Sequence, residues 1–381
     1  MSSRDFVHQL GGEHGLSSSR LSTRLHLDWL LLVSLALVCT SGLVVLYSGA
    51  DGNMKLVWRQ AAYMGLGTLS MVLLAQIEPA TYRRWALPVY LGGVALLVAT
   101  LFAGADAKGA QRWLQIPGVG VRLQPSEIMK IAVPMMVGAY LSRRPLPPSP
   151  KHLAGALLIC LIPALLIFRQ PDLGTAILIA ASGLFVIFLA GLSWKWIAGF
   201  VALVATAAPL FWFYVMHDYQ KQRVLTFLDP SKDPLGAGWN IIQSETAIGS
   251  GGLWGKGWLL GTQSHLDFLP ESHTDFIIAV LAEEFGYVGV LALLAGYLLI
   301  IGRGLYMAAT AQDTFCRVVA GALTLTFFVY VLVNMGMVSG LLPVVGVPLP
   351  LISYGGTSIL TLLSAFGVIM SLHTHRRMLG Y

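Results

Sequence analysis

Runs of apolar residues, each close to the length that crosses a bilayer, follow one another along almost the whole chain. A bilayer core is about 30 Å thick, so one helical crossing needs roughly 20 predominantly apolar residues. The runs occupy residues 29–48, 60–77, 86–104, 128–141, 153–168, 173–193, 196–215, 276–301, 318–340 and 353–372. The sequence therefore predicts an all-α, polytopic membrane protein with about ten transmembrane helices.

The composition agrees with a membrane protein and excludes several other classes. Apolar and aromatic residues make up 56% of the 381 residues, charged residues only 11%, and the mean hydropathy is +0.72. A water-soluble core cannot cover so much apolar surface. The net charge of +6 is scattered over the connections instead of forming one stripe, so we expect no nucleic-acid partner. The three cysteines are isolated and predict neither a disulfide nor a metal site.

Lysine and arginine residues in the connections set the predicted orientation. They favour the connections that are inner when the N-terminus is cytoplasmic, namely Arg4, Arg20, Arg24, Arg83, Arg84, Arg143, Arg144, Lys151, Lys195, Arg303, Arg317, Arg376 and Arg377. Both termini are therefore predicted to be cytoplasmic. The basic residues that remain in short outer connections oppose this preference, so we expect them to have a role there, such as meeting an anionic substrate.

The chain is predicted to contain one domain between two tails. Residues 1–27 are polar and Ser-rich and predict a disordered cytoplasmic tail, residues 28–373 form a single transmembrane domain, and residues 374–381 are a second cytoplasmic tail. The only long connection, 216–274, is expected to be an outer loop with short interfacial helices. No internal repeat is evident, which argues against a transporter built from inverted repeats.

The most prominent polar cluster is Leu269-Pro-Glu-Ser-His-Thr-Asp275, directly before the eighth run. Asp275 either caps a helix or takes part in chemistry, and the residue alone favours neither reading. Glu283 and Glu284 lie deeper in the same run, where a carboxylate costs a few kcal/mol unless it is paired or hydrated. We therefore expect a polar cavity or a partner cation, and for Glu284 a structural partner on another helix.

A second cluster combines Arg112 and Trp113 with Arg122 and the start of the fourth run. Pro125 suits the first position of a helix, and Glu127 and Lys130 lie three residues apart on one helix face. One interpretation is an ion pair that neutralises itself. The other, which we favour, is a pocket in which three basic side chains surround a pyrophosphate while Trp113 stacks on an apolar or sugar face.

Two further segments combine polar residues with Pro and Gly. Residues 169–175 contain Asp172 in a tight outer turn, which proline and glycine explain without any function. Residues 341–358 lead into the tenth run. Their non-helical backbone could form one wall of a site, or Ser353 could simply cap the tenth helix.

These motifs resemble those of the SEDS family of bacterial peptidoglycan polymerases. The residues that carry the resemblance are Gln124-Pro-Ser-Glu127, Gln170-Pro-Asp-Leu-Gly-Thr175, Leu269-Pro-Glu-Ser-His-Thr-Asp275-Phe-Ile with Ala282-Glu-Glu-Phe-Gly286, and Leu349-Pro-Leu-Ile-Ser-Tyr-Gly-Gly356. They span nearly the whole chain after the N-terminal tail. Residues 261–268 and 344–350 are more similar to RodA, the cell-elongation branch, than to FtsW, the division branch.

The resemblance implies a glycosyltransferase that polymerises lipid II into glycan strands at the outer face of the cytoplasmic membrane. It places the essential carboxylate at Asp275, as a general base, with a prenyl pyrophosphate as the leaving group. Direct displacement would invert the donor and form β-1,4 linkages. His273, Thr274, Ser353 and Trp113 are expected to contact substrate.

The charge of the leaving group must also be neutralised. We assign Arg112, Arg122 and Lys130 to this task, with Glu127 and Asp172 ordering the basic groups. Asp172 and Asp275 are candidate ligands of a divalent cation, Mg²⁺ or Mn²⁺, although the motif residues do not have the spacing of a metal site.

The resemblance also implies partners. These are lipid II and a lipid-linked glycan strand, a class B penicillin-binding protein that contacts the outer loop and the eighth and ninth helices, and other proteins of the elongation complex. Two alternatives belong to other classes: a transporter that flips lipid II, and a scaffold without chemistry. The polar groups gather at one end of the helices and form no path through the midplane, which favours the enzyme.

Overall fold

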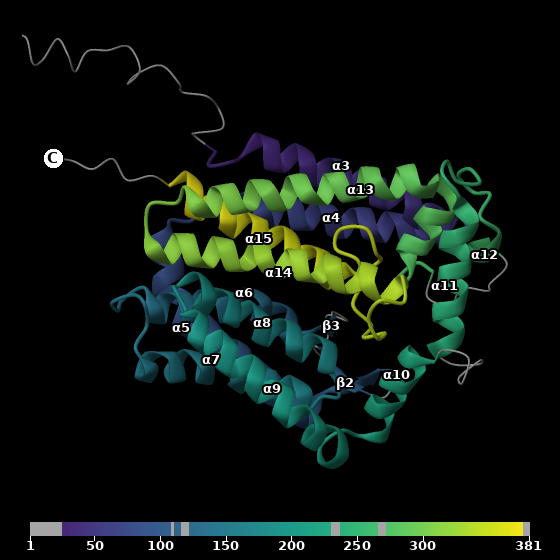
Figure 1. The fold of residues 1–381 in the computed structure, drawn as a ribbon. Helices are drawn as coiled ribbons and strands as arrows, with labels where there is room; N and C mark the ends of the chain where they lie inside the picture. Colours follow the sequence, from purple (N-terminus) through teal and green to yellow (C-terminus); the bar gives the residue numbers. More distant parts are fainter. Residues whose placement is uncertain (1–24, 108–109, 116–121, 230–236, 266–271, 376–381) are drawn as a thin grey trace, which may run out of the picture.

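The computed structural model describes residues 25–107, 110–115, 122–229, 237–265 and 272–375. Five long helices lie side by side in the upper half of Figure 1. They are α3 (Trp29–Gly49), α4 (Met54–Ala75), α13 (Ile277–Ala309), α14 (Thr314–Val338) and α15 (Gly356–Thr374). A second group comprises α5 (Pro79–Ala103), α6 (Pro125–Leu141), α7 (Pro150–Phe168) and α8 (Leu173–Leu189), with α9 (Trp194–Tyr214) along its edge. Contacts of α14 with α6 and α8 join the two groups.

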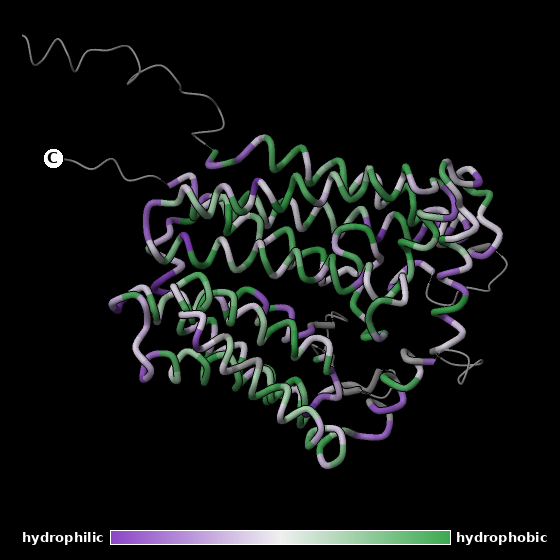
Figure 2. The backbone as a smooth tube through the Cα atoms, viewed as in Figure 1, coloured by the Kyte–Doolittle hydropathy of each residue, from purple (hydrophilic) through white to green (hydrophobic). Residues whose placement is uncertain are grey.

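Each predicted apolar run falls on one of these helices. Hydrophobic residues cover the long helices and hydrophilic ones gather at the turns (Figure 2), as expected where lipid surrounds the middle of a bundle. In the described part of the chain, six helices are long and apolar enough to cross a membrane. The chain is thus mostly helical, and the full number of ten crossings stays a prediction.

Three short antiparallel strands between α5 and α6 were not expected in an all-α chain. β1 (Ala105–Ala107) pairs with β2 (Ala110–Gln115), which pairs with β3 (Arg122–Leu123). The sequence between the two apolar runs is more polar and contains glycine and proline residues, which do not favour a helix. Pairing as strands satisfies backbone groups that would otherwise lack partners. The strands place Trp113 beside the first turn of α6.

The long connection is packed against the bundle over part of its length. It contains α10 (Asp218–Leu228), α11 (Ala237–Gly251) and α12 (Thr262–His265), and α11 contacts α13. Figure 1 shows α11 crossing the end of the bundle. Glycines permit the close approach, because a Cβ on Gly251 would lie 2.0 Å from the Ala282 carbonyl oxygen.

The helix α13 is broken at Gly286, which has φ +66° and ψ −163°. The chain after α11 fills the break: the backbone N–H groups of Lys256 and Gly257 donate to the carbonyls of Glu283 and Glu284, each at 3.0 Å. A Cβ on Gly286 would lie 2.3 Å from the Gly255 nitrogen. The predicted eighth helix is therefore two helical pieces joined at a glycine.

We expect Gly286→Ala to lower stability by more than about 1 kcal/mol, since alanine is strained at positive φ and its methyl group would meet backbone atoms. The measurement is thermal unfolding of the purified protein in detergent. Gly302→Ala in the same helix is the matched control, because a Cβ there meets no atom within 4 Å. Equal melting temperatures for the two variants would contradict the role given to the break.

At the opposite end, Asp28 ties the start of α3 to α13. Its carboxylate accepts a hydrogen bond from the Leu31 N–H at 2.9 Å, which caps α3, and lies 2.6 Å from the Arg303 guanidinium. Burial alone would raise the pKa of Asp28, but the hydrogen bonds from Arg303 and Leu31 lower it overall. The ionised carboxylate therefore stabilises the fold above the ordinary aspartate pKa, and this contribution is lost as pH falls through the lowered value.

We expect Asp28→Ala to cost about 1–2 kcal/mol of stability at neutral pH, because it removes both the cap and the ion pair. Asp28→Asn keeps a cap and should cost less. Melting temperatures measured from pH 7 down to pH 3 should converge for the native protein and the alanine variant. A gap that stays constant with pH would contradict the assignment.

Candidate active site

A cavity of about 720 Å³ opens at the end of the bundle where α6 begins. Side chains from both helix groups line it. They are Arg59 and Tyr63 of α4, Trp113 of β2, Gln124, Glu127 and Lys130 at the start of α6, Asp172 and Thr175 at the start of α8, Tyr330 of α14, and residues of the segments 346–348 and 354–358. The site is thus assembled from helix ends.

Glu127 and Lys130 form the most buried charged pair of this cavity. The helix α6 begins at Pro125, as predicted, so Glu127 falls in its first turn and Lys130 follows one turn later. The Lys130 ammonium lies 2.7 Å from a Glu127 oxygen and 4.7 Å from the centre of the Tyr330 ring. Both residues are less than a tenth exposed. The predicted ion pair is therefore confirmed, and it lies in the cavity wall, so the two interpretations of this cluster do not exclude each other.

Asp172 lies at the N-terminus of α8, on the wall of the same cavity. Its carboxylate accepts a hydrogen bond from the Thr175 N–H at 3.2 Å and so caps the helix. Gly174 follows, and a Cβ there would lie 3.1 Å from the Val345 carbonyl oxygen. Glycine thereby lets the irregular segment before α15 approach the start of α8.

The irregular segment that precedes α15 is held by buried polar side chains. Ser353 accepts a hydrogen bond from the Leu349 N–H at 2.8 Å and donates to the Thr274 carbonyl at 2.6 Å. Gln60 donates to the Ser353 carbonyl at 2.8 Å, and Tyr297 donates to the Pro350 carbonyl at 2.6 Å. Backbone without helical hydrogen bonds therefore finds side-chain partners, which allows it to line a cavity in an apolar bundle.

Asp275 lies beside this segment, just before α13. Asn334 of α14 donates to the Asp275 carbonyl at 2.9 Å and to the Val347 carbonyl at 2.7 Å, and so ties the two chain segments together. One carboxylate oxygen of Asp275 lies 3.5 Å from the position that a Cβ on Gly346 would occupy. Gly346 has φ +71° and lines the cavity. The carboxylate therefore lies next to Gly346 in the cavity wall.

The structure gathers most of the predicted site residues. Trp113, Glu127, Lys130 and Asp172 line the cavity, while His273 and Thr274 contribute backbone carbonyls that fix Tyr354 and Ser353. Arg112 and Arg122 lie on strands β2 and β3, and their side chains are outside the described part, as is the motif segment 269–271.

Two alternative capping roles are wrong. The N-cap of α13 is Phe276 instead of Asp275, and the N-cap of α15 is Gly355 instead of Ser353. In both places the helix begins later than the apolar run, at Ile277 instead of residue 276 and at Gly356 instead of residue 353. Asp275 and Ser353 are thereby left in non-helical backbone, where the Ser353 hydroxyl bonds to Leu349 and Thr274 and the Asp275 carboxylate lies beside Gly346.

The two deeper glutamates have structural partners. Glu283 accepts from the Lys256 ammonium at 2.7 Å and from the backbone N–H groups of Thr262 and Gln263 at 2.8 and 2.9 Å. Glu284 accepts from the Ser48 hydroxyl of α3 and from the Leu259 N–H. The expected partner cation and the expected partner on another helix are thus confirmed. Lys256 therefore helps to hold the long connection in place.

Several residues of the cavity and its wall escaped the sequence analysis. Tyr330, Arg59 and Tyr63 line the cavity, and Asn334 and Gln60 position its wall. Asn334 and Gln60 carried a usable signal, because polar side chains inside apolar helices are costly and usually face a functional interior. Tyr330 carried none, since aromatic residues are common in such helices.

Among the described residues, no three or more His, Cys, Asp or Glu side chains are grouped so that they could hold a metal ion. Asp172 and Asp275 remain the candidate ligands. Two carboxylates suit Mg²⁺ only where phosphate oxygens of a substrate and water complete its shell.

The fold and the cavity define a multi-pass membrane protein with a charged site built at helix ends. A family described as cell cycle protein, which groups FtsW, RodA and SpoVE, matches residues 23–378. The chain is 57% identical over 358 residues to the peptidoglycan glycosyltransferase MrdB of Escherichia coli K12, covering 94% of this chain and 96% of that protein. It is 37% identical over 361 residues to the probable peptidoglycan glycosyltransferase FtsW of Geobacter metallireducens, covering 91% and 94%.

Solved structures agree. A chain from a peptidoglycan synthase complex that coordinates polymerization and crosslinking superposes with a TM-score of 0.80 at 31% identity, covering 91% of this chain and 97% of that one. The rod shape determining protein RodA of Thermus thermophilus gives 0.70 at 28% identity, covering 92% and 98%. The chain belongs to the FtsW, RodA and SpoVE family, as the motifs predicted. It is a multi-pass protein of the bacterial inner membrane.

Proposed function

We propose that this chain is a peptidoglycan glycosyltransferase that polymerises lipid II during cell elongation. The observation that carries the proposal is a cavity lined by the buried Lys130 and by Gly346, with the Asp275 carboxylate beside Gly346. The names of the relatives, MrdB among them, support the same activity. The RodA-like motifs support the role in elongation.

In the proposed reaction, Asp275 takes the proton from the acceptor sugar's hydroxyl as that oxygen attacks the anomeric carbon of the donor. The bond between this carbon and the prenyl pyrophosphate breaks, and the pyrophosphate leaves with the bonding electrons. One displacement inverts the configuration and gives a β-1,4 linkage without a covalent intermediate. The carboxylate needs a fixed position for this role, which the hydrogen bonds of Asn334 and Ser353 to residues 274 and 275 support.

Lys130 is proposed to neutralise charge on the leaving group, together with Arg112 and Arg122 from the neighbouring strands. Glu127 holds the Lys130 ammonium in the cavity wall, and Trp113 offers a ring for an apolar or sugar face. A divalent cation held by Asp172 or Asp275 would add a Lewis acid at the phosphates. The steps above use only the side chains of this chain.

The proposed topology puts both termini in the cytoplasm and the cavity at the outer face. Residues 1–27 and 374–381 are the inner tails, and 216–274 is the outer connection. The superposition with a chain of a complex for polymerization and crosslinking supports a crosslinking partner. We propose a class B penicillin-binding protein, which would contact α11, α13 and α14 at the outer end.

Purified full-length protein, with its transpeptidase partner, should convert labelled lipid II in detergent into glycan strands, resolved by gel electrophoresis. The same preparation in liposomes should show no lipid II flipping that depends on Asp275. Flipping without strands would favour the transporter, and neither activity in a folded complex would favour a scaffold. Either result would overturn the proposal.

A further inference from the structure

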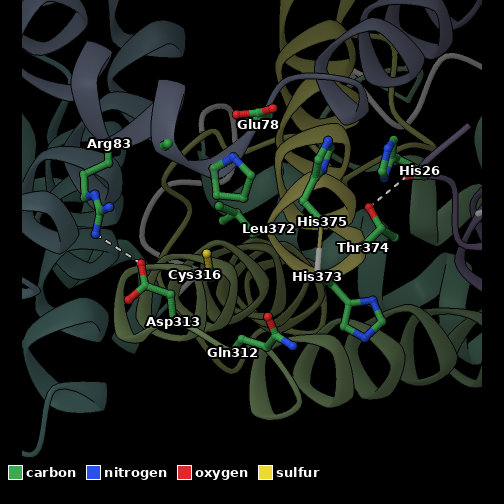
Figure 3. A pocket seen from close by; sticks show the side chains of 12 residues that line it. His26, Glu78, Arg83, Gln312, Asp313, Cys316, Leu372, His373, Thr374 and His375 are labelled. Atoms are coloured by element: carbon green, nitrogen blue, oxygen red, sulfur yellow. Dashed lines mark hydrogen bonds and ion pairs between the residues drawn. The ribbon is translucent and has the colours of Figure 1, made fainter. Parts of the chain in front are cut away.

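The end of the bundle opposite the catalytic cavity carries two cavities that share Arg83. The larger, about 580 Å³, is lined by the starts of α5 and α14 and by the end of α15 (Figure 3). There the Arg83 guanidinium points toward Asp313 and lies 3.2 Å from its carboxylate. The charge of Arg83 is therefore compensated, and this residue ties α5 to α14.

The smaller cavity, about 480 Å³, lies between α5 and α6. Unlike the larger cavity, it is lined by basic residues without acidic ones. Its lining is Arg83, Arg84, Leu87 and Pro88 of α5, Met136, Ala139 and Tyr140 of α6, and Arg143 and Arg144 just after α6. No carboxylate lines it. Among the described residues, no acidic side chain forms an ion pair with Arg84, Arg143 or Arg144. Three positive charges therefore meet at one site without compensation from the described chain.

The site is built and not merely a charged surface. The Arg144 guanidinium lies 3.6 Å from the centre of the Tyr140 ring and donates to the Tyr140 carbonyl at 3.1 Å. The Tyr140 ring meets His152 of α7 edge to face, with centres 6.4 Å apart. Gly155 leaves the space that Tyr140 fills, since a Cβ there would lie 2.2 Å from the Tyr140 hydroxyl. Arg144 is thus held in place before any ligand arrives.

An apolar wall adjoins the arginines. Leu87 is half exposed, Pro88 is exposed, and Met136 faces them from α6. The wall lies one to two helical turns from the arginines, toward the apolar middle of the bundle. Arginines beside an apolar wall suit a molecule that has both a phosphate head group and hydrocarbon chains. A soluble phosphate would need only the arginines.

We propose that the cavity formed by Arg84, Arg143 and Arg144 between α5 and α6 binds the phosphate head group of an anionic phospholipid. The acyl chains lie along Leu87, Pro88 and Met136. The lipid comes from the leaflet at the end of the bundle where α3 begins and α15 ends, which under the proposed topology is the cytoplasmic one. Because α6 also carries Glu127 and Lys130 near its other end, the lipid holds one of the helices that line the catalytic cavity.

The test uses full-length protein, stripped of lipid in detergent and titrated with phosphatidylglycerol by native mass spectrometry. Arg84 and Arg143 are both exposed, so Arg84→Gln with Arg143→Gln should fold normally, and its melting temperature is checked. The matched control is Lys151→Gln with Lys195→Gln, two exposed basic residues predicted at the same end but outside the cavity. The same titration is repeated with phosphatidylethanolamine, a zwitterionic lipid, and with glycerol 3-phosphate, a soluble phosphate without acyl chains.

We expect phosphatidylglycerol affinity to fall about tenfold in the arginine variant and less than about twofold in the control. Phosphatidylethanolamine should bind both variants equally. Equal losses in the two variants would mean general surface charge and overturn the proposal, as would displacement of the lipid by equimolar glycerol 3-phosphate. The measurement needs no turnover, so its failure is distinct from failure of the glycosyltransferase proposal.

Discussion

Asp275→Asn is expected to lower the rate of glycan-strand synthesis by about 10²- to 10⁴-fold, the usual contribution of a general base. Asparagine has the size of aspartate but cannot accept the proton of the attacking hydroxyl. The hydrogen bond from Asn334 reaches the backbone carbonyl of residue 275, so the substitution leaves it in place. The loss should therefore appear in catalysis, with little change in melting temperature. The measurement is the initial rate at which labelled lipid II enters strands.

Asp51→Asn is the matched control. Asp51 lies in the exposed turn between α3 and α4 with φ +51°, a conformation that asparagine tolerates well. The same change of charge should leave the rate within about twofold there, as is usual for a surface substitution. If Asp275→Asn kept more than a tenth of the native rate while remaining folded, another group would have to be the base. Lipid II binding measured in parallel should be retained.

The apolar runs predicted the helices well because the interactions that form a helix in lipid lie within the helix itself. A chain in lipid must satisfy its backbone hydrogen bonds within each helix, so length and hydropathy suffice. The break in α13 at Gly286 could not be predicted in this way. It depends on Lys256 and Gly257, some thirty residues earlier, whose N–H groups occupy the carbonyls of Glu283 and Glu284. The glycines of the long connection are explained only by the close packing of this connection against the break in α13.

The site could be predicted in part for a related reason. Glu127 and Lys130 share a helix face, so their pairing follows from helical spacing. The approach of Asp275 to Gly346 joins segments that are far apart in sequence, and it depends on Asn334 and Ser353 bonding across them. The apolar pattern also puts Asp275 directly before the helix, as a possible cap, whereas α13 begins at Ile277 and Phe276 is its N-cap. The motif around Asp275 pointed to the residue, while the neighbours that hold it are seen only in three dimensions.

Lys130→Met is expected to have two separate effects. It removes the proposed partner of the leaving-group charge, which should lower the polymerisation rate by about 10²- to 10³-fold. It also leaves Glu127 buried without its cation, which should cost about 3–5 kcal/mol of stability. A low rate from this variant alone could therefore reflect poor folding.

Combining Lys130→Met with Glu127→Gln separates the two effects. The double variant has no buried charge at this position, so much of the lost stability should return, since replacing a whole buried ion pair is often nearly neutral. Activity should stay low, because no cation is restored to the cavity. Melting temperature and initial rate are measured on the same preparations. Recovery of both together would mean that the pair only stabilises the fold, and the leaving group would then need its charge met by other residues of the cavity.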